Sequence, residues 1–204
     1  METLEKQSVK ETIKASLKNS MSYESYRELV SDLVEQKSTT GADKSMAMAN
    51  YTMLNDRRMR RWDKTVKISE EAKSSIQLFD KKVTWLVISE SWCGDAAHVI
   101  PVLNKIADLN PNIELRIVLR DDNLELMDEF LTNGGRAIAK LIMLDENLNV
   151  LNTFGHRPSA ATEMVKAYKE LHGSLSPEFK EELQHWYNKD KGQTTIADLI
   201  DLLT

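Results

Sequence analysis

The chain has 204 residues, of which 41% are hydrophobic and 29% charged, and its net charge is −5. This composition is typical of a folded globular protein, and the negative charge disfavours nucleic acids and anionic membranes as partners. The longest apolar run, Trp85–Ile88, is far too short to cross a bilayer, and the N-terminus has no apolar signal segment. The single cysteine, Cys93, cannot form an internal disulfide. We therefore expect one compact cytoplasmic protein.

The first eighty residues are predicted to form four helices. Apolar residues at helical spacing indicate a helix around residues 26–34 and a weaker one before it, over residues 4–17. A third helix is predicted to carry the methionines of residues 46–59, and a fourth to run from about Glu70 to Phe79 with Ser69 as its N-cap. The apolar stripe of the second helix comprises Tyr26, Leu29, Val30, Leu33 and Val34.

The pattern changes at Lys81, where strands begin. The run VTWLVIS at residues 83–89 is rich in β-branched and aromatic residues and too short for a core helix, which predicts a strand buried on both faces. A helix over residues 94–109 ends at Asn110-Pro111, and IELRIVL then indicates a second strand. This β-α-β unit predicts two parallel strands joined by a right-handed crossover.

The rest of the chain is predicted to contain a helix, a β-hairpin and two or three further helices. The helix follows Asp122 and ends at Gly134, and LIMLD and LNVLNTF then flank the polar turn Glu146-Asn147. Among the last helices, Pro177 is well placed for a first turn. We divide the chain into a helical extension packed on the core at residues 1–80, a central domain at residues 81–172 and C-terminal helices at residues 173–204.

One short motif lies at the turn between the first strand and its helix. Residues 91–96 read Ser-Trp-Cys-Gly-Asp-Ala, Pro101 stands eight residues after Cys93, and Gly155 follows the hairpin. In these features the chain resembles the thioredoxin superfamily, and within it a bacterial thioredoxin-like family with a helical N-terminal extension. The resemblance covers about residues 83–171. It implies an α/β thioredoxin-like fold, in which helices flank a central mixed β-sheet, with helical extensions at both ends.

The resemblance also implies a functional site around Cys93, which would be the catalytic thiol. A cysteine at the first turn of a helix lies near unpaired N–H groups and the positive end of the helix dipole, and both favour the thiolate. Substrate would bind beside Trp92 and Gly94. The other substrate-binding residues that the resemblance implies are Ile138, Ala139 and Gly155. No metal site and no cofactor is expected.

Several departures from the thioredoxin pattern limit this implied activity. Ala96 stands where redox-cycling thioredoxins have their second cysteine, so no neighbouring thiol can resolve a mixed disulfide. Ala139 stands at the position of the cis-proline, and we expect the peptide bond before it to be trans, because a cis bond before a non-proline residue costs about 3 kcal/mol. Val87 replaces a buried carboxylate, and Asp95 beside the thiol would oppose ionisation. We therefore expect a near-normal pKa for Cys93.

Two hypotheses follow for the function. In the first, the protein is a monothiol redox protein: Cys93 exchanges with a disulfide, and a protein or low-molecular-weight thiol resolves the product. In the second, it is a redox-inactive thioredoxin-fold binding or scaffolding protein. A one-cysteine peroxidase is less favoured because Glu90 stands where peroxiredoxins have a threonine, and Trp92 disfavours an iron–sulfur glutaredoxin. The sequence predicts no oligomeric state.

Other side chains near these motifs are interpreted as structural. Five positions along the helix turn His98 about 140° away from Cys93, so we expect a surface histidine. The arginines of residues 57–61 are expected on a solvated helix face. Arg136 and Lys140 are the charged residues expected near the Cys93 thiolate. Methionines are expected to fill the core of the extension, namely Met46, Met48, Met53 and Met59.

Overall fold

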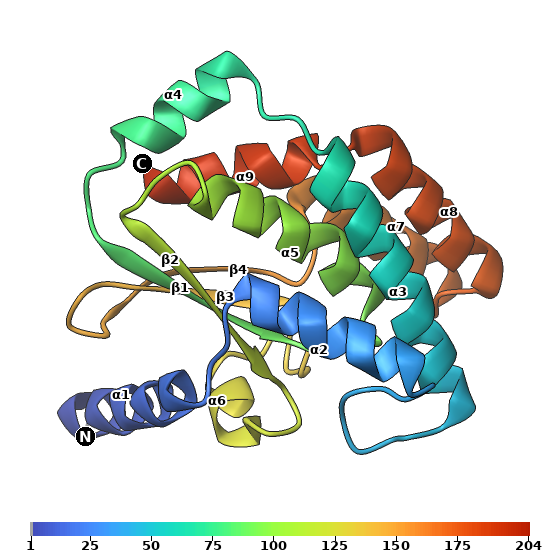
Figure 1. Ribbon diagram of the computed structural model, residues 1–204, viewed down its shortest axis with the longest axis horizontal. Helices are drawn as coiled ribbons and strands as arrows, with labels where there is room; N and C mark the ends of the chain where they lie inside the picture. The colour runs from blue at the N-terminus through green and yellow to red at the C-terminus, as the bar shows by residue number, and fades with distance from the viewer. Residues whose placement is uncertain (1) are drawn as a thin grey trace.

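A four-stranded mixed β-sheet forms the centre of the computed structural model, which describes residues 2–204 (Figure 1). The strand order is β2-β1-β3-β4. Strand β1 (Val83–Ser89) pairs in parallel with β2 (Ile113–Leu119) and antiparallel with β3 (Lys140–Leu144), which forms a hairpin with β4 (Val150–Gly155). The predicted parallel pair and the predicted hairpin are both confirmed.

Strand β1 is the central element and is buried on both faces, as its apolar run predicts. Trp85, Leu86, Val87 and Ile88 are all fully buried. The connection from β1 to β2 passes through α5 (Gly94–Ala107), whose inward face is apolar and which contains Pro101. This unit places the turn after β1, which carries Cys93, at the carboxyl end of the central strand.

Within the described residues, four helices precede the sheet, as predicted. They are α1 (Glu2–Lys18), α2 (Tyr23–Glu35), α3 (Met46–Thr65) and α4 (Glu70–Leu78). The last three begin at serine N-caps, Ser22, Ser45 and Ser69, and each side chain accepts a hydrogen bond from the N–H group three residues later. The predicted cap at Ser69 is thereby confirmed.

The remaining helices are α6 (Leu124–Glu129), α7 (Ser159–His172), α8 (Pro177–Asp190) and α9 (Gln193–Leu203). Pro177 occupies the first turn of α8, as expected, because its missing N–H group has no intrahelical partner there. Helix α6 is shorter than predicted, and the exposed Leu124 and Leu131 lie at and beyond its ends. None of the helices that the structure describes is long and apolar enough to cross a membrane.

Helices cover both faces of the sheet. In Figure 1, α1 and α6 lie on one side of the strands, and α3, α5 and α9 lie on the other. Ile13, Tyr26, Met59 and Trp62 from the first eighty residues share one hydrophobic core with the buried strands. A second, smaller cluster joins α7 to α8.

The expectation that the methionines of α3 fill the core is right for one of them and wrong for two. Met59 is fully buried, whereas Met46 and Met53 are exposed. The inward positions of the first half of α3 hold the smaller residues Ala49 and Thr52 instead. Met46 and Met53 are seven residues apart and therefore share one side of the helix, which is turned away from the side of Met59 by more than about 100°.

Candidate functional site

Cys93 lies between β1 and α5 and is the N-cap residue of that helix. Its Sγ donates a hydrogen bond to the carbonyl oxygen of Ile138 at 3.2 Å and accepts one from the N–H group of Ala96 at 3.5 Å. The side chain is only 8% exposed. Ala96, one helical turn later, is also buried, so a methyl group occupies the position of a resolving thiol.

Burial, and after it the neighbouring carboxylate of Asp95, raise the pKa of the Cys93 thiol to about 12. The backbone N–H groups of Ala96 and Asp95 and the charge of Arg157 act in the opposite direction but do not balance the loss of hydration. The expected near-normal pKa is wrong, because burial of the sulfur raises its pKa by more than the N-cap position lowers it.

The loop before β3 faces the thiol, as the resemblance implied. Gly155 pairs with Lys140 and lies so close to this loop that a Cβ atom would be 2.1 Å from the Ala139 carbonyl oxygen. The Ile138–Ala139 peptide bond is cis, and so is the bond between Gly155 and His156. Our expectation of a trans bond is therefore wrong. The expectation was based on the trans preference of an isolated peptide bond, which does not include the tertiary contacts of this loop.

Trp92 and Gly94 flank the thiol, but neither presents an open docking surface. Trp92 is half-buried, and the guanidinium of Arg120 lies 4.9 Å from the centre of its ring. A Cβ atom at Gly94 would be 3.3 Å from the Arg58 guanidinium, so α3 lies directly against the start of α5. The arrangement leaves little room for an incoming disulfide.

The segment between β4 and α7 and helix α8 cover the same turn through Asp95. Arg157 forms an ion pair with one carboxylate oxygen at 2.8 Å, and the Tyr187 hydroxyl of α8 donates to the other at 2.9 Å. Burial raises the pKa of Asp95, and these two partners favour its charged form. Asp95 was predicted to lie beside the thiol, but no local pattern in the sequence indicated Arg157 or Tyr187.

His98 is buried, and the expectation of a surface histidine is wrong. The Trp62 indole N–H donates to Nδ1 at 2.8 Å, and Nε2 lies 2.8 Å from the Gln184 side-chain oxygen. The ring also stacks on Tyr187, with centroids 4.1 Å apart. His98 does point away from Cys93, as its helical spacing predicted. However, α3 and α8 pack against that side of α5 and bury the ring.

The N-terminal extension holds the other side of the loop through Ser91. Thr40 donates its backbone N–H to the Ser91 hydroxyl and accepts a hydrogen bond from the Ser91 backbone. Asn55 donates to the Ser91 carbonyl oxygen at 2.9 Å, and Thr52 contacts the hydroxyl at 2.8 Å. All of these groups are buried. These residues were not predicted from the sequence, because isolated threonines and an asparagine on a helix resemble ordinary surface residues.

The charged residues expected near the thiolate do not reach it. Arg136 is exposed and forms two hydrogen bonds to Asp128. The Lys140 ammonium contacts only the Thr132 hydroxyl at 3.4 Å, and burial lowers its pKa. Arg157 is the cation whose charge acts on Cys93.

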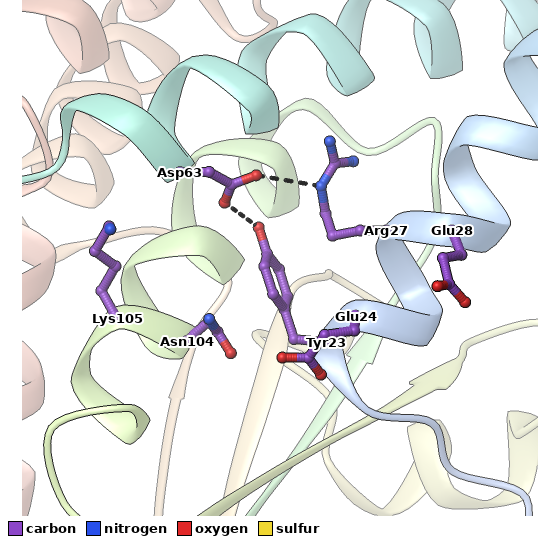
Figure 2. A pocket seen from close by; sticks show the side chains of 7 residues that line it. All are labelled: Tyr23, Glu24, Arg27, Glu28, Asp63, Asn104 and Lys105. Carbon is purple, nitrogen blue, oxygen red and sulfur yellow. Dashed lines mark hydrogen bonds and ion pairs between the residues drawn. The ribbon is translucent and has the colours of Figure 1, made fainter.

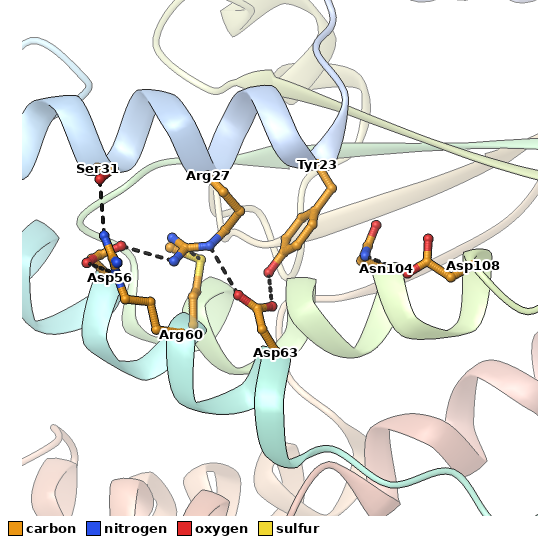
Figure 3. Close-up of polar contacts among 9 residues, drawn as sticks. Tyr23, Arg27, Ser31, Asp56, Arg60, Asp63, Asn104 and Asp108 are labelled. Carbon is orange, nitrogen blue, oxygen red and sulfur yellow. Dashed lines mark hydrogen bonds and ion pairs between the residues drawn. The ribbon is translucent and has the colours of Figure 1, made fainter.

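A second concave region lies between α2, α3 and α5. Figure 2 shows this pocket of about 410 Å³, with Tyr23 and Arg27 both directed at Asp63. The Tyr23 hydroxyl donates to Asp63 at 2.5 Å, and Arg27 pairs with both Asp63 and Asp56. In Figure 3 these contacts form a continuous chain between α2 and α3 that extends to Arg60. Its central polar groups are used in holding the helices together, so Cys93 remains the candidate site.

Comparison with known proteins places this geometry in context. A family model described as thioredoxin matches residues 41–169. The chain is 19% identical to PA1234 from Pseudomonas aeruginosa, a protein of unknown function, with a TM-score of 0.59 over 90% of this chain and 97% of that one. It is also 19% identical to an HIV epitope-scaffold, with a TM-score of 0.57 over 90% and 98% of the two chains. No curated protein matches. At this identity the structural likeness shows the fold.

Proposed function

The chain belongs to the thioredoxin family, and from this premise we propose that it is a redox-silent member that acts by binding a partner protein. The observation that carries the proposal is the state of Cys93. The residue is 8% exposed, the pKa of its thiol is raised to about 12, mainly by burial, and the chain has no other cysteine. A thiol in this state is almost entirely protonated at neutral pH, and the thiolate is the nucleophile in disulfide exchange.

The surroundings of the thiol support the same proposal. Helix α8 covers the start of α5 through Tyr187, and α3 covers it through Asn55 and Arg58. In a protein that exchanged disulfides, the sulfur would need an open path to its substrate. Here the chain itself occupies the space on both sides.

Alkylation of Cys93 tests this proposal. We expect iodoacetamide to modify the native protein slowly and the urea-unfolded protein rapidly, with an apparent thiol pKa in the native state well above the usual value. The unfolded protein serves as the control, because it contains the same single thiol without the surrounding side chains that bury it. Rapid native labelling with an apparent pKa below about 7.5 would contradict the proposal.

A monothiol exchange reaction is the second candidate, and one observation favours it. The sulfur keeps two backbone partners, the Ile138 carbonyl and the Ala96 N–H group. In this reaction the Cys93 thiolate attacks a disulfide, forms a mixed disulfide and releases one thiolate. A low-molecular-weight thiol then attacks the substrate sulfur of the mixed disulfide, forms a new disulfide with it and releases Cys93 as the free thiol. Formation of a glutathione adduct by the native protein would favour this candidate.

A further inference from the structure

The outward side of α3 carries an exposed surface that the site does not use. Its first half is apolar and its second half is cationic. We call it the α3 outer face, and it comprises Met46, Tyr51, Met53, Leu54, Arg57 and Arg61. Met46 is 62% exposed and Tyr51 52% exposed. Large apolar side chains gathered on one exposed helix face are typical of interaction surfaces.

The periodicity of α3 makes these residues one continuous surface. Met53 and Arg57 are four residues apart, and the Arg57 guanidinium contacts the Met53 sulfur. Leu54 and Arg61 follow along the same side of the helix at a spacing of seven residues. The centres of the apolar and cationic halves are about eight residues apart, which corresponds to about 12 Å along the axis.

The positive charge on this face is not neutralised by the protein. Among the side chains that the structure describes, neither Arg57 nor Arg61 forms an ion pair. The two carboxylates of α3, Asp56 and Asp63, bind Arg27 on α2 instead. Arg61 lies over the Trp62 ring and donates to the Asn188 side chain. An unneutralised cationic surface on a chain of net charge −5 indicates an acidic partner.

We propose that the α3 outer face binds an acidic segment of a partner protein, in which apolar side chains are followed about 12 Å later by carboxylates. This inference rests on the proposed binding function and names its surface and partner class. The apolar groups would pack on Tyr51 and Leu54, and the carboxylates would pair with Arg57 and Arg61.

Two features favour a protein segment over a membrane. An interfacial helix has its apolar and cationic faces side by side along its whole length, whereas the two halves of α3 follow one another along the axis. The opposite side of α3 is fixed in the core by Met59 and Trp62, so the helix cannot rotate or sink into lipid. The partner would lie next to the Cys93 loop, because Asn55 and Arg58 of the same helix contact it.

Binding of cysteine-free fluorescent peptides to the full chain tests the proposal by anisotropy. The test peptide is a helix with leucines on one face of its first half and glutamates on the same face of its second half. A scrambled peptide and a peptide with lysines in place of the glutamates are the controls. We expect saturable, salt-sensitive binding of the acidic peptide alone, weakened at least about tenfold in the Arg57→Glu/Arg61→Glu variant. The exposed pair Lys166→Glu/Lys180→Glu makes the same charge change elsewhere and should leave binding unchanged.

Other outcomes would overturn the proposal. These are equal binding of the scrambled peptide, equal effects of the two charge reversals, or no saturable binding of any peptide. Charge-dependent binding to phosphatidylserine vesicles instead of peptide would assign the face to a membrane, and a dimer abolished by Leu54→Ser would assign it to a second copy. Cys93→Ser should not alter peptide binding. Rapid disulfide exchange at Cys93 together with unchanged peptide binding would therefore contradict the proposed lack of redox activity. It would not contradict the proposed binding surface.

Discussion

Ala96 lies one helical turn after Cys93, at the position where a second thiol would resolve a mixed disulfide. We predict that the wild type does not reduce protein disulfides as a dithiol, and that Ala96→Cys can close an internal disulfide across this turn. Thiol titration after mild oxidation should find no free thiol in this variant. Ala72→Cys, on α4, adds a thiol away from the site and should keep both thiols free. Two free thiols in oxidised Ala96→Cys protein would refute the prediction.

His98 shows how hydrogen bonds fix the state of a buried residue. The Trp62 indole can only donate, so Nδ1 must accept, and the neutral ring therefore carries its proton on Nε2, which donates to Gln184. Burial lowers the pKa of His98 to about 3. Protonation of Nδ1 would place a second N–H group against that of Trp62 and break this hydrogen bond.

This histidine predicts a pH-dependent stability. Because its folded pKa lies below its unfolded value, the unfolded chain binds more protons between about pH 6.5 and 3. The contribution of the neutral His98 to the free energy of unfolding is complete above about pH 6.5. It is lost as the pH falls through this window, by up to about 1.4 kcal/mol per pH unit. Urea unfolding of wild type and His98→Gln across this range should show a steeper loss in the wild type. Parallel curves would show that His98 does not titrate on unfolding.

At the scale of elements, helix α8 packs over the turn between β1 and α5 that contains Cys93. Tyr187 combines three roles, because it donates to Asp95, stacks on His98 and packs in the α7–α8 cluster with Phe179. The aromatic ring fills space between helices, and the hydroxyl supplies the polar contact. These two contributions can be separated by substitution.

We predict that Tyr187→Ala uncovers Cys93 and costs about 3 kcal/mol of unfolding free energy. Alkylation of Cys93 in the native protein should accelerate by at least about tenfold in this variant. Tyr187→Phe keeps the ring and should change the rate much less. Phe179→Ala removes a ring from the same cluster without touching Asp95, so it controls for the loss of stability. Equal acceleration in both alanine variants would show that general destabilisation, and not uncovering, exposes the thiol.

The elements themselves were largely predictable from the sequence, because their signals are local. The apolar run of β1, the serine at residue 69 and the proline at residue 177 each act within a few residues. The covered site was not predictable in the same way. Contacts of Cys93 with Ile138 followed from the family resemblance, whereas those of Asp95 with Tyr187 join positions 92 residues apart and leave no periodic pattern. Exposed and buried methionines on α3 also look alike in a sequence.

At the scale of the whole molecule, the helices before the sheet are part of one folded unit. Ile13, Tyr26, Trp62 and Ile76 are buried in the same core as the strands. We predict that removal of residues 1–78 gives aggregated protein, because the apolar surface of the sheet and α5 would face water. Size-exclusion chromatography and denaturant unfolding of the fragment would check this. A monomeric fragment with a cooperative transition would show that the extension is a separable module.

The two outer strands of the sheet differ in what lies beside them. The segment before α2 runs along β2, where Met21 exchanges backbone hydrogen bonds with Ile117 and Arg116 binds Ser20. Strand β4 has no such neighbour among the described residues, and Val150 and Leu151 on it are exposed. The backbone groups of Ile117 on the β2 border are thus already engaged, whereas the outer border of β4 has no strand partner among the described residues. A strand of a second molecule could therefore add at β4 directly, but at β2 it would first have to displace Met21 from Ile117.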